Sequence, residues 1–495
     1  MTMKRTICIV LILLLLCGCT PAAETTASST RSASELTAPA SAETAPASAE
    51  TLPAATEAAL AGPEDLDADS VLLYRQEAFE ARQGTLLPLQ TALSAPEDEL
   101  IPRTHIYDEL FPGDAALWLR LLDYALGNGY QGFSVPTGTL SEIDLTQRRA
   151  LRFSYWIDGG KVLTLDRDGC TTVWYECEKP DTMEKFSLGL AAARELTAQA
   201  PRGDEWETAS WIFSWLAENV SYGDRTPYYF QRGHMLYDAL VEKDCLCSGY
   251  ATAMYYLCSL CGIECLNVYG LAADPETPGG LGDHLWNQVR IYGTWYVCDP
   301  TMNAVSKLGA PPIGFCVSSE TMQLWGGNKP TGEYTDAALI PACETSFDPV
   351  TAWNATPEGA LRSFLWFAAY DALNPTILLL QAGLLTRETK STPAEDGVSA
   401  STDIPYADFA AWADRFMSEE ARAEFPIRFS EAEDGGLFLQ KSETDTRDFW
   451  RSLKLGTVTD NGDGSWSADL GAASAVFTVS QNADGLYRIE SIELH

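Results

Sequence analysis

Apolar and polar residues alternate along this chain with the spacings of both helices and strands. A three-to-four-residue apolar period predicts helices over residues 115–129, 183–198, 205–219, 235–242, 247–261, 360–384 and 406–425. A two-residue alternation predicts strands over residues 150–156, 171–177, 284–291, 295–299, 474–480 and 486–494. Helices and hairpin-linked strands in mixed order predict an α+β fold.

The N-terminus has the layout of an export signal. Lys4 and Arg5 precede an apolar run over residues 7–16, which is too short to span a bilayer. The following Leu-Cys-Gly-Cys resembles a bacterial lipobox, which implies that residues 1–18 are a signal peptide and that Cys19 receives a diacylglyceryl group. The alternative is an ordinary signal peptide, but a polar tether follows Cys19 directly.

Composition divides the rest of the chain into a tether and several folded parts. Residues 19–62 are mostly Ala, Thr, Ser, Pro and Glu, which bury too little apolar surface to order a chain, so we expect a disordered spacer. The remainder suggests an N-terminal α+β portion, a core, a connecting region and a C-terminal α+β domain. Their expected bounds are 63–195, 196–310, 311–356 and 357–495.

The charge of the chain excludes some partners. A formal net charge of −36 would repel nucleic acid and anionic lipid head groups. We therefore expect no nucleic-acid partner, and contact with a membrane through the lipid anchor alone.

The chain contains a thiol, an imidazole and a carboxylate in the order expected of a nucleophilic site. Cys247 begins a predicted helix, where unpaired N–H groups and the helix dipole favour the thiolate. His284 and Asp299 lie on two strands joined by a tight turn at Tyr292-Gly293. That turn places Asp299 opposite Trp286 and diagonal to His284. His234 is the rival base, but it lacks a carboxylate at strand spacing.

These three motifs together resemble a known enzyme family. Cys-x-Gly-Tyr-Ala, His-x-Trp-Asn and Trp-Tyr-x-x-Asp-Pro-Thr, within about residues 196–303, resemble the transglutaminase-like superfamily with its papain-like core. The resemblance implies Cys247 as nucleophile, His284 as base and Asp299 as orienting carboxylate. It departs from the family at Cys245-Leu246, where a Gly-Val pair is more usual.

The resemblance implies an enzyme that forms a thioester with an amide substrate and needs no cofactor. A protein or peptide substrate, including cell-wall peptide, would contact Trp286 and the aromatic loop at Tyr228 and Tyr229. Hydrolysis and transamidation both remain open. The alternatives are an inactive surface lipoprotein that binds peptide or cell-wall ligands, and a zinc-organised scaffold.

Ten cysteines follow the signal region, which is many for an exported protein. Cys170 and Cys177 form the nearest candidate disulfide, and Cys258, Cys261 and Cys265 or Cys245 could be taken as zinc ligands. Buried free thiols are the favoured interpretation, because cysteine is often buried and two of these residues fit a helix face. We therefore expect no metal.

The C-terminal part shows no catalytic pattern. Asn-Gly-Asp-Gly at 461–464 and Asn-Ala-Asp-Gly at 482–485 predict hairpin turns. Two helices and a curved antiparallel sheet weakly resemble the cone-shaped domains of the nuclear-transport-factor-2-like class.

Overall fold

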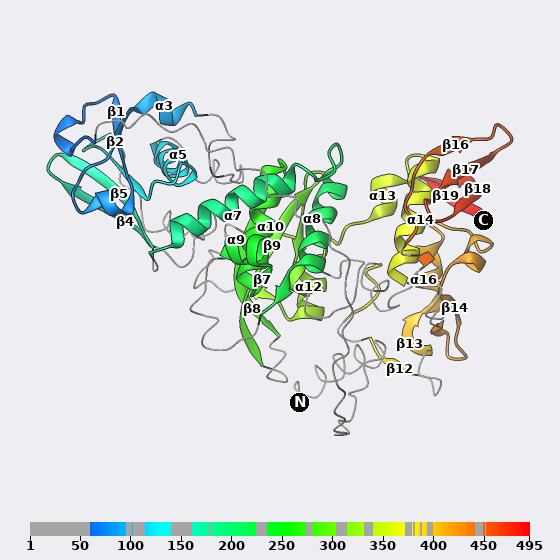
Figure 1. Cartoon of the computed structure of the whole chain (residues 1–495). Coiled ribbons are helices and arrows are strands. Elements are labelled where there is room, and N and C mark those ends of the chain that lie inside the picture. The colour runs from blue at the N-terminus through cyan, green and yellow to red at the C-terminus, as the bar shows by residue number, and fades with distance from the viewer. Residues whose placement is uncertain are drawn as a thin grey trace, which may run out of the picture.

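The chain folds into three lobes that follow one another in sequence (Figure 1). The computed structural model describes residues 60–95, 101, 114–139, 161–177, 180–223, 235–273, 280–302, 314–330, 340–371, 379, 382–386, 389–393, 399–440, 449–450 and 452–495. The signal peptide with Cys19, nearly all of the tether, the strand at 150–156, and Tyr228, Tyr229 and His234 lie outside the described residues.

The N-terminal lobe packs helices against an antiparallel sheet of order β2-β1-β3-β5-β4. Strand β1, which is apolar after Ser70 and has a strand neighbour on each side, is buried along its whole length. The lobe comprises η1 (Pro63–Asp65), β1 (Ser70–Tyr74), α2 (Gln76–Phe79), β2 (Thr85–Pro88), α3 (Leu89–Leu93), α5 (Asp114–Gly127), β3 (Gly132–Pro136), β4 (Lys161–Arg167) and β5 (Cys170–Glu176).

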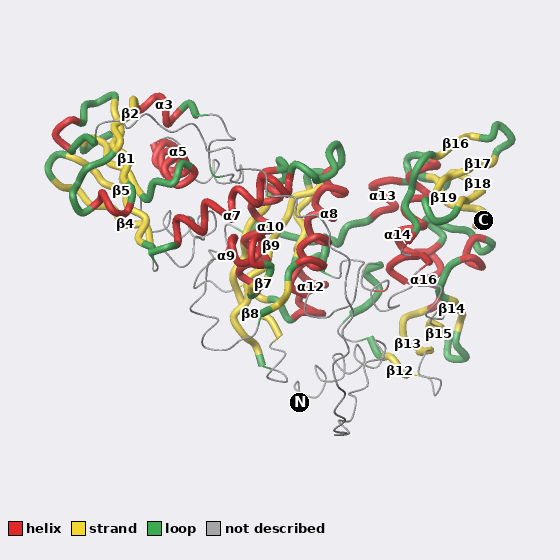
Figure 2. Tube along the Cα trace, in the orientation of Figure 1, coloured by secondary structure: helices red, strands yellow, loops and turns green. Residues whose placement is uncertain are grey.

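The central lobe packs helices against a sheet of order β10-β9-β8-β11. Figure 2 shows these helices and strands interleaved in the middle of the molecule. The lobe comprises α7 (Thr182–Thr197), α8 (Glu205–Asn219), β6 (Ser221–Tyr222), α9 (Met235–Tyr237), η4 (Asp238–Glu242), β7 (Asp244–Cys245), α10 (Cys247–Leu260), β8 (Cys265–Ala273), β9 (Leu281–Ile291), β10 (Thr294–Cys298), α12 (Ser319–Gly326) and β11 (Lys329–Pro330).

Helix α10 is the buried centre of this lobe. It packs on β9 and β8 on one side and on α7, α8 and α9 on the others. Every residue from Gly249 to Cys258 is buried. The predicted apolar stripe therefore extends around the whole helix, because a helix enclosed by a sheet and several helices has little polar face.

The C-terminal lobe has its own apolar core, from Val350 to Ile492. Two separate antiparallel sheets, β12-β13-β15-β14 and β16-β17-β18-β19, accompany its helices. The lobe comprises α13 (Pro349–Trp353), α14 (Pro357–Asp371), β12 (Ser391–Pro393), β13 (Ser399–Pro405), α16 (Tyr406–Ala413), η6 (Ala421–Glu424), β14 (Arg428–Glu431), β15 (Gly436–Gln440), β16 (Val458–Asp460), β17 (Ser465–Asp469), β18 (Ser474–Gln481) and β19 (Tyr487–Leu494).

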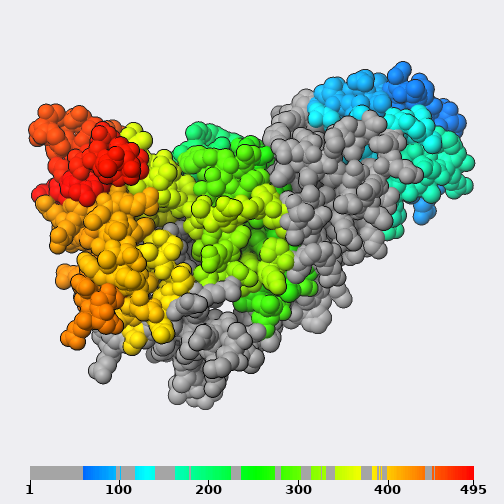
Figure 3. Space-filling view, turned by 180° about the vertical axis from the view of Figure 1, so that it is seen from behind, coloured from blue at the N-terminus to red at the C-terminus, as the bar shows by residue number. Residues whose placement is uncertain are grey.

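Aromatic and ionic contacts join the central and C-terminal lobes, which lie side by side in the space-filling view (Figure 3). Phe347 contacts the rings of Trp206 on α8 and Trp353 on α13. The guanidinium of Arg362 on α14 lies 4.0 Å from the centre of the Trp353 ring and 3.0 Å from a carboxylate oxygen of Glu207. The junction therefore combines apolar packing with a cation–π contact.

The α+β fold predicted from the sequence is confirmed, and both hairpins at 461–464 and 482–485 are present. The helix predicted over 406–425 begins at Tyr406 as expected, but its predicted length is wrong, because α16 ends at Ala413. The Ser418 N–H donates to the carbonyl of Ile489, and its hydroxyl donates to that of Glu490. The chain after α16 thus forms hydrogen bonds with β19 instead of continuing the helix. The expected single curved sheet of this lobe is instead two sheets.

None of the helices within the described residues is both long enough and apolar enough to cross a membrane.

Candidate active site

Cys247 is the first residue of α10. Its N-cap residue, Leu246, has an extended backbone and no side-chain oxygen with which to cap the helix. The positive end of the helix dipole therefore acts on the Cys247 sulfur. Cys247 as a whole residue is of intermediate exposure, whereas α10 is buried from Gly249 to Cys258.

A short parallel strand pair holds the chain in place just before Cys247. Strand β7 pairs with β6, with Tyr222 opposite Cys245, and the Gly223 N–H donates to the Cys245 carbonyl. Cys245 is 2% exposed, and burial raises the pKa of its thiol well above the usual range. The Cys-Leu departure from the family pattern therefore places a buried, protonated thiol beside the reactive position.

Strands β9 and β10 carry the other two groups. Their turn consists of Tyr292 and Gly293, both with positive φ, and the ladder runs to Cys298 opposite Asn287. This register places Asp299 across from Trp286 and diagonal to His284, as the sequence predicted. The Tyr292 hydroxyl donates to Asp204 at 2.7 Å, and this bond fixes the turn against the start of α8.

His284 and Asp299 form a buried contact. His284 Nε2 lies 2.6 Å from Oδ2 of Asp299. The carboxylate is fully buried and the imidazole is 9% exposed. His284 also acts on the Cys247 thiol, whose pKa it lowers. Because Nε2 is engaged by Asp299, Nδ1 is the ring nitrogen left to face the sulfur. The structure thus brings Cys247, His284 and Asp299 into one chain of contacts.

The electrostatics favour a charged pair. Burial acts to lower the pKa of His284, but the attraction of the Asp299 carboxylate and its hydrogen bond outweigh burial and raise the pKa to about 10. Burial likewise acts to raise the pKa of Cys247, but the hydrogen bond and the charge of His284 bring it below the usual value. The arrangement therefore favours a thiolate beside an imidazolium at neutral pH.

Trp286 does not suit the substrate contact expected for it. Its side chain is 2% exposed and packs in a small apolar cluster with Val268 and Val297. Its ring stacks beside the His284 ring with centres 6.0 Å apart. Because so little of its side chain is exposed, Trp286 is better suited to packing against the imidazole than to contacting a substrate. Tyr228 and Tyr229 lie outside the described residues.

The remaining residue of the His-x-Trp-Asn motif, Asn287, ties the sheet to the nucleophile helix. Its buried side-chain amide donates to the Ala251 carbonyl of α10 at 2.9 Å and to Asn267 Oδ1 at 2.8 Å. The strand that carries His284 is thereby hydrogen-bonded to the helix that carries Cys247. Sequence reasoning quoted this residue as part of the motif but assigned it no role.

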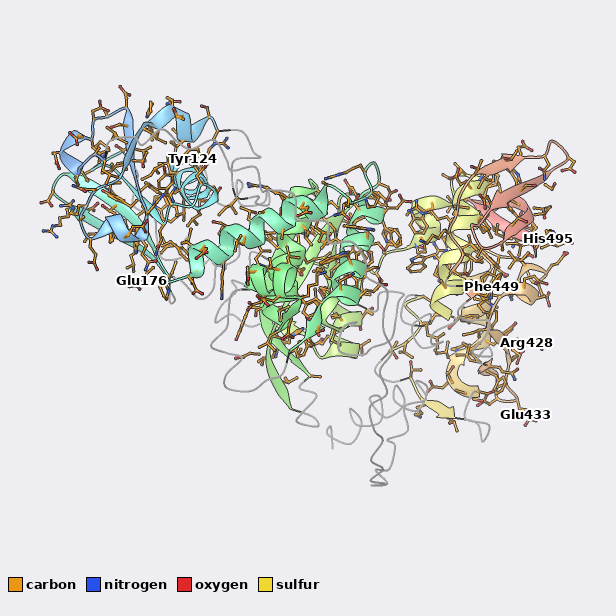
Figure 4. The ribbon with its side chains drawn as sticks, viewed as in Figure 1. Tyr124, Glu176, Arg428, Glu433, Phe449 and His495 are labelled. Carbon is orange, nitrogen blue, oxygen red and sulfur yellow. The ribbon has the colours of Figure 1, made fainter. Side chains whose placement is uncertain are left out.

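Two further residues also reach the site, Thr301 at the end of the third motif and Asn328 beyond it. The Asp299 carboxylate accepts from the Thr301 N–H at 3.1 Å and from the Asn328 side-chain amide at 3.3 Å. Sequence reasoning missed Asn328, because a Gly-Gly-Asn-Lys-Pro stretch indicates only a turn. Figure 4 marks the two outer lobes, with Tyr124 and Glu176 in one and Arg428 and His495 in the other, on either side of α10 and β9.

None of the ten described cysteines forms a disulfide, and seven of them are buried. The candidate disulfide between Cys170 and Cys177 is wrong. Cys170 begins β5 and Cys177 follows its last residue, so at about 3.3 Å per residue the two are far beyond disulfide reach.

The cysteines of the zinc hypothesis have other neighbours in the described part of the chain. The Cys258 thiol is in hydrogen-bonding contact with the Cys265 thiol, whereas Cys261 lies beside Arg202. No group of three or more His, Cys, Asp or Glu side chains among the described residues is arranged to hold a metal ion.

Comparison with known proteins agrees with this arrangement of thiol, imidazole and carboxylate. Residues 191–300 match the sequence model of the transglutaminase-like superfamily. This segment is a transglutaminase-like domain. It contains Cys247, His284 and Asp299, and the papain-like core predicted from the motifs is confirmed.

Several solved structures are similar to parts of the chain. A putative cysteine protease from Cytophaga hutchinsonii is 12% identical, with a TM-score of 0.19, over 29% of this chain and 62% of that protein. A TGase is 11% identical, with a TM-score of 0.21, over 46% and 66%. The periplasmic domain of TgpA from Pseudomonas aeruginosa is 16% identical, with a TM-score of 0.19, over 28% and 55%.

This chain thus spans less than two thirds of each of these three structures. No curated protein matches the chain.

The buried contact between His284 and Asp299 predicts an unusual imidazole titration. We expect His284 to keep its proton through its ordinary pKa of 6.5 and to lose it only as the pH rises through about 10. In Asp299→Asn the attracting charge is gone and burial opposes the imidazolium, so its pKa should fall by about 1–3 pH units. Nuclear magnetic resonance of the imidazole ring measures both values.

The matched control is Asp283→Asn, the same substitution on the neighbouring exposed position of β9. Successive strand side chains point to opposite faces, so this control should leave the His284 titration unchanged. A wild-type His284 that titrates near its ordinary pKa, or equal shifts in the two variants, would contradict the predicted ion pair.

Proposed function

We propose that this chain is a lipid-anchored, extracytoplasmic cysteine enzyme that acts on amide bonds of proteins or peptides through a thioester intermediate. The observation that carries the proposal is the buried contact of His284 with Asp299 at 2.6 Å, combined with the lowering of the Cys247 pKa by His284 at the start of α10. The transglutaminase-like domain at residues 191–300 provides the family context.

In the first half of the reaction, the Cys247 thiolate attacks the amide carbonyl carbon and a C–S bond forms. Backbone N–H groups near Cys247 would donate to the developing oxyanion, a contribution of about 3 kcal/mol per donor. The His284 imidazolium then gives its proton to the amide nitrogen, and the C–N bond breaks. Ammonia or an amine leaves, and the acyl group stays on sulfur.

In the second half, neutral His284 accepts a proton from the incoming nucleophile as that nucleophile attacks the thioester. The C–S bond breaks and the thiolate–imidazolium pair returns. Water as the nucleophile gives hydrolysis, and an amine gives transamidation. Asp299 stays ionised throughout and stabilises the imidazolium in both halves.

The cellular location in this proposal rests on the N-terminal sequence. The apolar run over residues 7–16 and the lipobox-like Leu-Cys-Gly-Cys provide export and an anchor at Cys19. The polar segment over residues 20–59 would hold the folded lobes away from the membrane surface, whose anionic lipids repel a chain of net charge −36.

Substrate turnover tests the reaction. We expect the protein to incorporate a fluorescent primary amine into glutamine-bearing proteins, or to cleave peptides, and Cys247→Ala to abolish either activity by at least about 10³-fold. Fluorescence on a gel measures the first activity, and mass spectrometry of the peptides measures the second.

Cys245→Ala is the matched control. It removes a thiol two residues away, at a position where the transglutaminase-like family more usually has the smaller residue glycine. It should keep the activity. Turnover that survives Cys247→Ala contradicts the proposed mechanism. A protein that binds peptide or cell-wall material but never turns it over supports the non-catalytic lipoprotein instead.

The anchor is tested in a bacterial host. We expect metabolic labelling with a fatty acid and recovery of the protein in the membrane fraction, with both lost in Cys19→Ala because the acceptor sulfur is gone. Cys17→Ala is the control, since a small residue two positions earlier leaves the acceptor intact. A Cys19→Ala protein that stays labelled and membrane-bound contradicts the anchor.

A further inference from the structure

Asn328 contacts the proposed triad from outside the family domain. The domain match ends at residue 300, and Asn328 lies 28 positions further on, between α12 and β11. Its side chain is 5% exposed. Its Nδ2 lies 3.3 Å from Oδ2 of Asp299, the same oxygen that contacts His284.

The backbone around Asn328 is fixed on both sides. Gly327, with φ of 69°, ends α12 in a left-handed cap. Lys329 and Pro330 then pair with β8 opposite Leu271 and Gly270. Gly270 is also the register partner of His284 on the other side of β8. The same strand residue therefore fixes the positions of both the imidazole and the Asn328 segment.

Two glycines provide the space for this approach. A Cβ on Gly270 would come within 2.2 Å of the Lys329 carbonyl oxygen, and a Cβ on Gly326 would come within 2.3 Å of Asn328 Oδ1. Each would force the segment away from the site. The close packing of β11 on β8 thus depends on residues without side chains.

Chemistry fixes which end of the Asn328 amide faces Asp299. An ionised carboxylate only accepts hydrogen bonds, so the NH₂ group must point at it and the carbonyl oxygen away. That oxygen, Oδ1, is buried without a hydrogen-bond partner among the described residues. An unpartnered buried carbonyl is unfavourable, so this placement of Asn328 costs stability.

We propose that Asn328 is a positioning residue for the triad: its amide holds the Asp299 carboxylate in the orientation that receives the His284 N–H. The inference rests on the proposed function, because it assigns Asn328 a task in activating Cys247. Asp299 accepts from Thr301 on Oδ1 and from both His284 and Asn328 on Oδ2. Without the Asn328 amide, Oδ2 loses one of its two donors and the carboxylate is held less firmly toward His284.

The test measures the pH dependence of Cys247 alkylation by iodoacetamide, followed by mass spectrometry of the Cys247 peptide. It needs no substrate. In Asn328→Ala we expect the rate at pH 7 to fall about tenfold, the cost of one hydrogen bond to a buried charge. The acidic limb of the profile should move to higher pH, because a poorly held Asp299 supports the imidazolium less.

Asn328→Asp distinguishes positioning from packing, because it keeps the size of the side chain. The groups that act on His284 are Asp299 and Cys247, and a second carboxyl beside Asp299 would have a raised pKa. Below that pKa the proton on the introduced carboxyl replaces the amide donor. We expect alkylation near the wild-type rate at pH 5 and a growing deficit as the pH rises and the proton is lost.

Lys329→Ala is the matched control, since this neighbouring side chain is exposed and should leave the profile unchanged. Circular dichroism checks that each variant is folded. Wild-type profiles in both Asn328 variants overturn the inference, as do equal deficits in both at every pH, which indicate packing alone. A wild-type Cys247 no more reactive than an ordinary thiol instead overturns the proposed function.

Discussion

The buried contact between His284 and Asp299 is the interaction on which the rest of the site depends. A carboxylate with no exposed surface is costly to bury unless it is paired and hydrogen-bonded, and here an imidazole, a backbone N–H and an amide all donate to it. The pairing in turn holds a positive charge on an imidazole that burial alone would neutralise. That charge is what favours a thiolate at Cys247 over a thiol.

The surrounding fold fixes this contact from several directions. The β9–β10 hairpin sets the register of His284 and Asp299, and the Tyr292 hydroxyl holds its turn against α8. Asn287 bonds β9 to α10, so sulfur and imidazole cannot move apart without breaking a buried hydrogen bond. The segment after the family domain completes the site through Asn328. The two outer lobes contribute no residue to these contacts within the described chain.

Sequence reasoning found the site where local patterns determine geometry. A two-residue turn fixes strand register, so the diagonal placement of Asp299 and His284 followed from Tyr292-Gly293 alone. It failed where distant segments decide the outcome. Trp286 carries an aromatic ring typical of substrate sites, but packing against Val268 and Val297 buries it. The helix beginning at Tyr406 ends at Ala413, and Ser418 beyond it bonds instead to β19, some 70 residues later. Asn328 has no local signal at all, since its role exists only once β11 lies beside β8.

The ultraviolet absorbance of the thiolate tests the central claim most directly. A thiolate absorbs near 240 nm and a thiol does not, so the difference between wild type and Cys247→Ala reports the charge on this sulfur alone. The account predicts a thiolate signal that is already present at pH 6–7, where an ordinary thiol of pKa about 8.5 is protonated. A signal that appears only above pH 8 would mean that His284 and Asp299 do not ionise Cys247, and would contradict the account.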